Sequence, residues 1–353
     1  MSETTSHSRP EMVAFIREMP KVELHVHLEG SIRPATLLRL AERNGVALPA
    51  HDLDELRDFY RFIDFTHFLR VYLTISSCLQ TVDDFELVAY EFGADMARQN
   101  IRYAEVTFTP YPNVQRTGLP FADILTGLNA GRARAQADFG VEFRWVLDIV
   151  RDNPDSGPQV VRWAAAAQER GVIGLGLGGP EQGHPPEQVA DAYAQARRAG
   201  LHSLPHAGEL VGPESVWGAL RSLGAERIGH GVRSIEDPAL VDYLVERQIP
   251  LEICPTSNLR LGVYPSYRAH PLRRLWERGV YVTVNSDDPP MFGTDLVGEY
   301  LVLVEQMGFT AADLEQLSLN ALRASFWPEK AAQEEAFRAE FTRLRVRYLG
   351  GSK

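Results

Sequence analysis

The chain has 353 residues, a formal net charge of −11 at pH 7, 44% hydrophobic residues and 24% charged residues. This composition is typical of a globular protein with a large core. The acidic balance, without a basic run interleaved with aromatic residues, argues against nucleic acid as a partner. The sequence shows no secretion signal and no segment of ~20 apolar residues that would cross a bilayer, so we predict a cytoplasmic protein without a membrane partner.

No internal repeat, low-complexity tract or flexible linker divides the chain. We therefore expect a single domain over residues 1–353, with residues 1–15 as a disordered tail. The two cysteines, Cys78 and Cys254, are too few for a disulfide framework and are not spaced as a Cys-x-x-Cys metal site. We predict that both are reduced.

Short apolar and β-branched segments recur along the chain and are predicted to be strands. In chain order they cover residues 22–27, 103–109, 143–150, 172–177, 201–207, 227–230, 251–254 and 281–285. Helical patterns lie between many of them, over 83–99, 159–170, 186–198, 214–223, 238–248 and 270–278.

The alternation of strands and helices predicts an α/β fold with a parallel sheet. Eight strands match a single (β/α)8 TIM barrel better than the alternative, an open doubly wound sheet. Two segments lie outside the simple repeat. We expect extra helices after the first strand, over 34–79, and a helical cover at the C-terminus, over 310–349.

Polar motifs follow several of the predicted strands, at the face of a barrel where catalytic residues gather. His25 and His27 lie two residues apart and point to the same side of the first strand, an arrangement that suits zinc. Such a pair is weak evidence alone. The fifth strand ends in His206, with Glu209 three residues later, which supplies a third ligand and an acid.

The sixth and eighth strands add further polar groups. His230 lies between two glycines that allow a bound group to approach the backbone closely. Asp287 and Asp288 are adjacent at a strand end and aim in different directions, so one can bind metal while the other faces substrate. Each motif alone is more often a surface residue or a turn, but together they indicate a site. We predict that the remaining histidines are not catalytic: His7, His51, His67, His184, His202 and His270.

The glycine-rich fourth strand, GLGLGGPE, is not a nucleotide-binding loop, because Pro180 follows at once and no GxGxxG opens a helix. We expect its backbone N–H groups to contact a flat ligand. The segment 59–78 carries aromatic residues at helical spacing, which predicts either a lid that excludes water or ordinary core. These residues are Phe62, Phe65, Phe68 and Tyr72.

Over essentially its full length the sequence resembles the adenosine deaminase family of the amidohydrolase superfamily. The resemblance rests on HVHLEGS, YAEVTFTP, GGPE, HAGE, GHG, CPTSN, NSDDP and NALRASFWPE in chain order. It implies hydrolytic removal of the amino group at purine C6 with one zinc ion, Zn2+, as cofactor and a small 6-aminopurine as the partner. The implied zinc ligands are His25, His27, His206 and Asp287, with one position open for water.

The resemblance also implies roles for the other polar groups. Glu209 protonates purine N1, and His230 orients the attacking water and helps to deprotonate it. Asp288 contacts N7, and the backbone N–H of Gly179 contacts N3. A carboxyl group in an apolar, crowded site can hold the proton that such an acid needs.

Departures from the family pattern bear on the substrate. Adenosine deaminases usually carry HLDG, whose Asp reaches the ribose 5′-hydroxyl, whereas Glu29 stands here and is the predicted substrate contact at this position. Adenine deaminases share HLEG but usually show FFDPQTH-like and DDPAYFGG segments, which here read VTFTPYPN and DDPPMFGT. The chain looks most similar to the bacterial branch that accepts 5′-altered adenine nucleosides, including 6-amino-6-deoxyfutalosine of menaquinone synthesis. In addition, Gly176 replaces an acid of the family's fourth strand.

Two alternatives to a nucleoside deaminase stay open at this point. One is deamination of free adenine. The other is a catalytically silent barrel that only binds a ligand. Dinuclear amidohydrolase chemistry is disfavoured, because the fourth strand has no lysine to bridge two metals.

Overall fold

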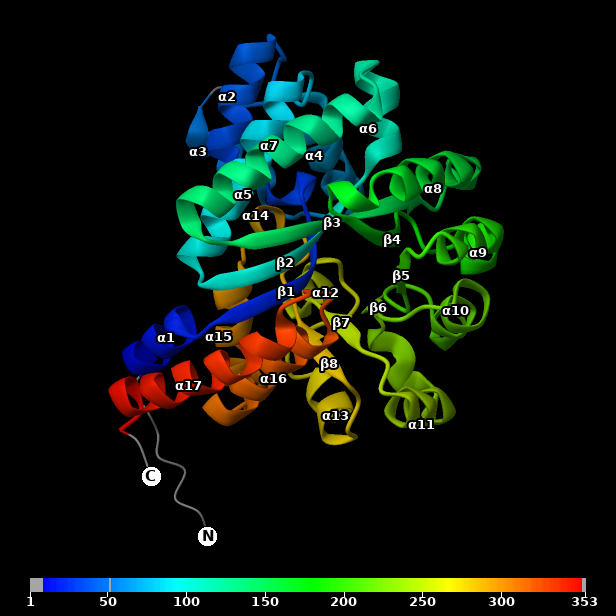
Figure 1. Cartoon of the computed structure of the whole chain (residues 1–353). Coiled ribbons are helices and arrows are strands. Elements are labelled where there is room, and N and C mark those ends of the chain that lie inside the picture. The colour runs from blue at the N-terminus through cyan, green and yellow to red at the C-terminus, as the bar shows by residue number, and fades with distance from the viewer. Residues whose placement is uncertain (1–8, 51, 351–353) are drawn as a thin grey trace.

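The structure is a computed structural model that describes residues 9–50 and 52–350. One eight-stranded sheet runs in the order β1 to β8, with parallel pairing between successive strands (Figure 1). Every predicted strand is confirmed. The observed strands are β1 (Lys21–His27), β2 (Ile101–Phe108), β3 (Glu142–Val150), β4 (Val172–Gly178), β5 (His202–Ala207), β6 (Ile228–His230), β7 (Leu251–Ile253) and β8 (Val282–Val284).

The barrel closes where the chain beyond β8 meets β1. Val26 forms a parallel bridge with Asp287, outside the named strands. The amide of His27 donates to the carbonyl of Asp287 at 2.9 Å, and the amide of Asp287 donates to the carbonyl of His25 at 3.2 Å. This confirms the (β/α)8 barrel and rules out an open sheet with two free edges.

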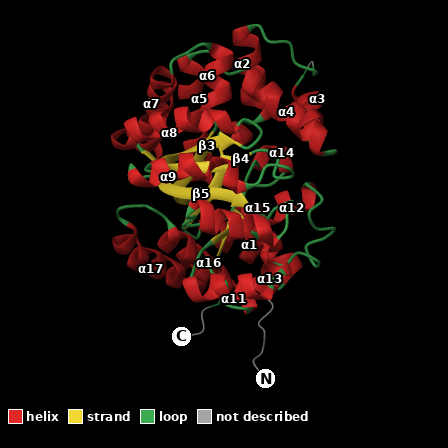
Figure 2. Ribbon diagram, turned by 90° about the vertical axis from the view of Figure 1, so that its right-hand side faces the viewer, coloured by secondary structure: helices red, strands yellow, loops and turns green. Residues whose placement is uncertain are grey.

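Helices surround the sheet, and the strands occupy the centre of the molecule (Figure 2). The helices after the strands are α5 (Val82–Arg98), α6 (Pro110–Thr117), α7 (Phe121–Phe139), α8 (Gly157–Ala166), α9 (Ala190–Arg198), α10 (Pro213–Gly218), α11 (Pro238–Arg247), α12 (Pro255–Arg260), α13 (Leu272–Glu277), α14 (Pro289–Phe292) and α15 (Leu296–Met307). Among the described residues, no helix is both long and apolar enough to cross a membrane.

The extra helices predicted outside the repeat are present. After β1 the chain forms α2 (Pro34–Asn44), α3 (Leu53–Tyr60) and α4 (Phe65–Ser77). At the C-terminus α16 (Ala311–Ala324) packs on β1 and β8, and α17 (Lys330–Tyr348) packs on α16. Thr310 caps α16 and Thr81 caps α5, each in a reciprocal capping box with the Asp three residues later.

The sequence did not predict α7, although it has 19 residues. Glycines interrupt its helical pattern, and they have a packing role. A Cβ at Gly127 or Gly131 would overlap the backbone of α5. These glycines therefore allow α5 and α7 to approach closely. Glycine also lowers helix propensity, so the local sequence pattern does not indicate a helix over these residues.

The expected disordered tail over 1–15 is wrong for residues 9–15. They belong to α1 (Arg9–Glu18), in which Phe15 and Ile16 are fully buried. Helix α1 lies beside α17 (Figure 1), and Tyr348 donates to Glu18 at 2.5 Å. The apolar face of α1 is thus covered by the C-terminal helix, a long-range contact that composition does not reveal. Residues 1–8 lie outside the described part of the chain.

A buried ionic network joins strands on opposite sides of the barrel. The Arg227 guanidinium contacts Glu105 of β2 and lies 2.5 Å from Glu252 of β7. It also donates to the Ala324 carbonyl at the end of α16 at 2.9 Å. All three charged side chains are almost completely buried. Such a network is strongly destabilised when one partner is lost, because the other charges remain buried and unpaired.

We therefore expect Arg227→Ala to lower the free energy of unfolding by about 3–5 kcal/mol, since the buried carboxylates of Glu105 and Glu252 would lose the cation between them. Urea unfolding at pH 7 measures the change. The control is Arg247→Ala, an exposed arginine 61% accessible at its side chain, which should shift the same quantity by less than about 0.5 kcal/mol. Equal effects of the two substitutions would contradict the role of the network.

Candidate metal centre and active site

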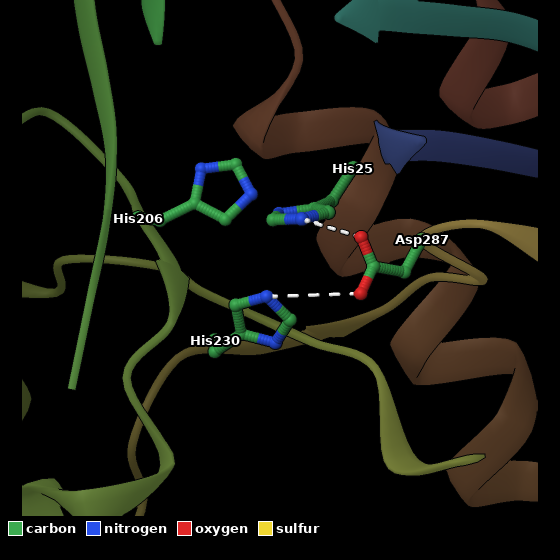
Figure 3. Close-up of side chains that lie close together, drawn as sticks. All are labelled: His25, His206, His230 and Asp287. Carbon is green, nitrogen blue, oxygen red and sulfur yellow. Dashed lines mark ion pairs between the residues drawn. The ribbon is translucent and has the colours of Figure 1, made fainter. Parts of the chain in front are cut away.

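Histidine and aspartate side chains from distant strands meet at the carboxyl ends of the barrel. His25 comes from β1, His206 from β5, His230 from the last position of β6, and Asp287 from the loop after β8. One ligand atom from each of these four lies within 4.8 Å of the other three (Figure 3). The figure shows His25 and His230 each facing one oxygen of Asp287, with His206 on the other side of the group.

His27, the other predicted ligand, also reaches this centre. Its Nε2 atom lies 3.2 Å from His206 Nε2 and 3.3 Å from Asp287 Oδ1. His25 Nε2 lies 3.4 Å from the same Oδ1 atom. Zinc–ligand bonds of 2.0–2.2 Å in a tetrahedron give ligand–ligand separations of about 3.4 Å.

The group within 4.8 Å contains His230 in place of His27, so two sets of four ligands compete. His230 Nε2 lies 3.8 Å from Asp287 and approaches its Oδ2 atom rather than Oδ1. The His27 separations of 3.2 and 3.3 Å match the edges of a zinc tetrahedron, whereas His230 belongs to the set that lies mutually within 4.8 Å. His27 and His230 are therefore the two candidates for the fourth ligand beside His25, His206 and Asp287.

Neighbouring groups orient two of these ligands. Glu252 Oε2 lies 3.1 Å from His25 Nδ1, which places the His25 proton on that nitrogen and leaves Nε2 free. Ser257 donates to Asp287 Oδ2 at 2.6 Å, which leaves Oδ1 directed at the histidines. His25 Nε2 is buried and has no hydrogen-bond partner among the described residues. A cation would satisfy it, so these residues fit a metal ion.

The electrostatics of the centre point the same way. Burial opposes the charged form of His25, yet the nearby carboxylates of Asp287 and Glu252 raise its pKa to about 10. Burial opposes charge on Asp287 as well, but the adjacent imidazoles of His25 and His27 hold its pKa well below the usual value. Burial and the neighbouring His25 hold the pKa of His206 well below its usual value. Positive charge beside the Asp287 carboxylate is therefore favoured. A bound metal ion would supply this charge in place of protons.

Two residues of this centre have strained backbones. His230 has φ 60° and Asp287 has φ 66°, in the left-handed region that residues other than glycine rarely adopt. Each lies at the end of a barrel strand, where this conformation turns the chain sharply. Strain of this kind, of order 1–3 kcal/mol, persists where the surrounding structure fixes the residue and is common at functional sites.

Glu209, the predicted acid, lies next to the histidines. Its Oε1 atom lies 3.5 Å from His230 Nε2, and its side chain is 16% exposed. Burial, followed by repulsion from Asp287 and Glu181, holds the pKa of Glu209 well above its usual value. Glu209 is therefore suited to remain protonated and to donate a proton.

Glu181, whose role local sequence patterns do not indicate, holds the turn that carries Glu209. Its buried carboxylate accepts hydrogen bonds from the Ser215 hydroxyl at 2.5 Å and from four successive backbone amides. The amides belong to Gly208, Glu209, Leu210 and Val211, at 2.6 to 3.2 Å. The signal available in the sequence was an acid directly after the glycine-rich strand end, GGPE, with no assigned role.

Asp288 and Glu29, the predicted substrate contacts, lie close to the metal ligands. Asp288 Oδ1 and Glu29 Oε2 are buried and have no hydrogen-bond partner among the described residues. Burial raises the pKa of each to about 7. Glu29 Oε1 is held by the Thr109 amide at 3.2 Å and the Asn113 side chain at 3.0 Å. A Cβ at Gly30 would overlap the Asp288 carboxyl, so the glycine of HLEG leaves the space that the second aspartate of the DDP motif occupies.

The end of β4 presents backbone and makes room for another acid. Gly179 has φ 90° and is exposed, so its backbone is accessible. A Cβ at Gly176 or Gly178 would overlap the carboxyl of Asp148 on β3. Asp148 is buried, has an unpartnered Oδ1 atom, and burial raises its pKa to about 6. Gly176 stands where the family pattern has an acid, and the carboxyl of Asp148 on the neighbouring strand occupies the space that this glycine leaves. In the sequence Asp148 is the acid within the apolar run of β3.

The aromatic residues of segment 59–78 pack over α14, which follows Asp288. Phe68 stacks on Phe292 with ring centroids 5.4 Å apart, and Phe62 lies 6.3 Å from the same ring. The Tyr72 hydroxyl lies 3.5 Å from Thr109, whose amide binds Glu29. These aromatic residues therefore border the site, and lid movement stays a prediction. The side chain of Phe65 lies outside the described part of the structure.

Two of the histidines predicted to be non-catalytic are linked to this centre through one other residue, His184 through Arg151 and His270 through Asn258. His202 pairs with Glu226 at 3.0 Å, and His67 of α4 lies beside Phe59 of α3. His184 contributes a backbone carbonyl to Arg151. His270 is linked to His230 through Asn258. His7 and His51 lie outside the described residues.

The comparison with protein families matches residues 20–337 to the adenosine deaminase family. The chain belongs to the adenosine deaminase family. It is 43% identical over 316 residues to the aminodeoxyfutalosine deaminase of Streptomyces coelicolor, covering 89% of this chain and 81% of the relative. It is 38% identical over 325 residues to the adenine deaminase of Cupriavidus necator, covering 92% of each.

Among solved structures, an amidohydrolase from Burkhoderia ambifaria with bound Zn superposes with a TM-score of 0.90. It is 30% identical and covers 99% of this chain and 98% of its own. As a member of the adenosine deaminase family the protein is an enzyme that acts on C–N bonds, so the alternative of a catalytically silent barrel is not retained.

The anchoring of the Glu209 turn gives a testable expectation for this adenosine deaminase family member. Glu181→Gln places an amide N–H₂ group against backbone N–H donors, so the turn must shift. A misplacement of about 1 Å costs up to about 10²-fold in rate. We expect kcat to fall by about 10- to 100-fold while metal content is retained. Steady-state kinetics and elemental analysis measure both.

The matched control is Glu187→Gln, an exposed glutamate six positions along the same loop region, which should leave kcat unchanged. If Glu181→Gln has full activity, Glu181 does not position the acid.

Proposed function

We propose that the protein binds one zinc ion through His25, His27, His206 and Asp287. We further propose that it hydrolyses the amino group from C6 of an adenine nucleoside, releasing ammonia and leaving the 6-oxopurine. The observation that carries the proposal is the position of Glu209, a carboxyl group held protonated by burial, beside a buried cluster of metal-ligating side chains. A bound zinc would supply a nucleophile at neutral pH by lowering the pKa of a water molecule.

The residues of the chain have separate tasks in this reaction. Attack at C6 pushes electrons onto N1, and Glu209 donates its proton there so that negative charge does not accumulate on the ring. His230, 3.5 Å from Glu209, holds the attacking water in line with C6. The attacking water supplies two protons. One replaces the proton that Glu209 gave to N1, and the other passes to the amino group, which leaves as ammonia as the C6–N bond breaks and the C6–O double bond forms.

The purine would be oriented by groups around this centre. Asp288, with a pKa raised to about 7, can carry a proton toward N7. Gly179 is exposed, and its backbone N–H would donate to N3. Aromatic residues of α4 and α14 would exclude water from the ring.

We favour a 5′-modified nucleoside, 6-amino-6-deoxyfutalosine, as the substrate. Glu29 Oε2 is a buried acceptor without a partner, and leaving such a group unpaired costs about 1–3 kcal/mol. A sugar or 5′-substituent can donate to it, whereas free adenine has no hydroxyl group. The relative with 43% identity carries the name aminodeoxyfutalosine deaminase, which supports this choice. The 38% identical adenine deaminase makes free adenine the second candidate.

Initial rates with three substrates test the choice. We expect kcat/KM to be lowest for adenine, because both nucleosides offer sugar hydroxyl groups to Glu29 and adenine offers none. We expect it to be highest for 6-amino-6-deoxyfutalosine, in line with the name of the 43% identical relative. Loss of absorbance on conversion to the 6-oxopurine gives the rates. A higher kcat/KM for adenine than for both nucleosides would replace the proposal with the second candidate.

Replacement of the acid tests the chemistry itself. Glu209→Gln keeps the shape and removes the proton donor, so we expect kcat to fall by about 10²- to 10⁴-fold with zinc content unchanged. Ammonia release and elemental analysis provide the two readouts. The control is Glu214→Gln, an exposed glutamate five residues later, which should keep full activity. A fully active Glu209→Gln enzyme would remove Glu209 from the reaction.

A further inference from the structure

A chain of hydrogen bonds behind the active site runs from a backbone amide to His230. It involves Asn258 and His270, which are both buried and belong to neither set of candidate metal ligands. The Leu272 amide lies 3.1 Å from His270 Nδ1, His270 Nε2 lies 3.1 Å from Asn258 Oδ1, and Asn258 Nδ2 lies 3.2 Å from His230 Nδ1.

The first link fixes where His270 carries its proton. A backbone N–H can only donate, so the Leu272 amide requires an unprotonated Nδ1 on His270. A histidine in this state has one proton, on Nε2. His270 is 3% exposed, and burial lowers its pKa to about 3, which agrees with a neutral ring.

The second and third links carry this polarity to the active site. Because His270 Nε2 donates, the atom of Asn258 that faces it must be the oxygen, which settles the orientation of the amide. The Asn258 N–H₂ group then faces His230 and donates to Nδ1. Neutral His230 must therefore carry its proton on Nε2.

We propose that His270, acting through Asn258, fixes His230 in the form protonated on Nε2, so that His230 meets the reaction centre as a hydrogen-bond donor. His230 Nε2 points at the space between Glu209, 3.5 Å away, and Asp287, 3.8 Å away. As a donor it orients the oxygen of the attacking water and has no lone pair for the metal. Asn258 and His270 are positioning residues, because they act through His230.

The effect of this hydrogen-bond chain on catalysis rests on the proposed function. Its effect on the position of the His230 proton does not. It also bears on the competing ligand sets. A nitrogen that carries a proton cannot coordinate a metal, so the hydrogen-bond chain favours His27 over His230 as the fourth ligand. The role implied for His230 by family resemblance, removal of a proton from water, is correspondingly reduced to orientation.

The test uses the full-length protein with ¹⁵N-labelled histidine, with and without zinc. Long-range ¹⁵N–¹H spectra report which ring nitrogen of each histidine carries the proton, and the His230→Gln spectrum assigns the His230 signals by their loss. We expect His230 to be protonated on Nε2 in both samples. Protonation on Nδ1 in the unsubstituted protein would overturn the proposal whatever its activity.

Asn258→Asp reverses the last link without changing the size of the side chain. A carboxylate accepts from His270 as the amide oxygen did, but it also accepts from His230, which moves the His230 proton to Nδ1. A wrong histidine tautomer costs about 10⁴-fold in the well-studied serine protease case. We expect the ¹⁵N signature to move to Nδ1–H and kcat to fall by about 10²- to 10⁴-fold, with KM and zinc content little changed.

Substitutions at His270 separate positioning from a merely structural role. His270→Gln keeps an N–H donor toward Asn258 and should retain the Nε2–H signature and most of kcat, whereas His270→Phe removes the donor and should lose both. His202→Gln, a part-exposed histidine paired with Glu226, is the control and should change neither readout. An unchanged His230 signature and unchanged kcat in both Asn258→Asp and His270→Phe would contradict the proposal. A shifted signature in a protein that deaminates no purine would uphold it and refute the proposed function instead.

Discussion

Backbone pairing between β1 and Asp287 is the contact on which the candidate metal centre depends. Two hydrogen bonds, from His27 to Asp287 and from Asp287 to His25, close the barrel and set the register of the two strand ends. Because side chains alternate along a strand, a shift of one residue would turn both histidines away from the aspartate. The closure that stabilises the fold therefore also assembles the ligands, and the positive φ of Asp287 directs its carboxylate at them.

The density of buried ionisable groups gives the site its chemistry. Asp287 is held ionised by the histidines, while Glu209 next to it is held protonated by burial and by the neighbouring carboxylates. Two carboxyl groups in one cavity thus take opposite protonation states, as acid–base chemistry at neutral pH requires. Supporting contacts maintain the difference: Ser257 orients Asp287, and Glu181 anchors the turn that carries Glu209.

Local sequence patterns were sufficient for the strands and for the polar groups at their ends. Buried parallel strands are continuous apolar runs, so β1 to β8 and the motifs that follow them could be located without the structure. Helices α1 and α7 could not, because α1 is stabilised by contact with α17 and α7 by glycines fitted against α5.

Local sequence patterns do not indicate the residues that support the site, because the contacts of these residues are also long-range. Glu181 binds amides 27 to 30 residues away, and Asp148 occupies space left by glycines of the next strand. His270 was predicted to be non-catalytic, and its contact with Asn258 gives it a positioning role that only the three-dimensional arrangement reveals. The sequence thus identifies groups that can react, while the groups that orient them depend on long-range contacts.

We infer above all that His25, His27, His206 and Asp287 hold one zinc ion beside Glu209. X-ray diffraction from crystals of the zinc-loaded protein, recorded on both sides of the zinc absorption edge, locates the metal. We expect a single anomalous peak about 2.0–2.2 Å from Nε2 of His25, His27 and His206 and from an Asp287 oxygen, with His230 outside bonding distance. A peak bonded to His230 in place of His27, or no peak at this centre, would contradict it.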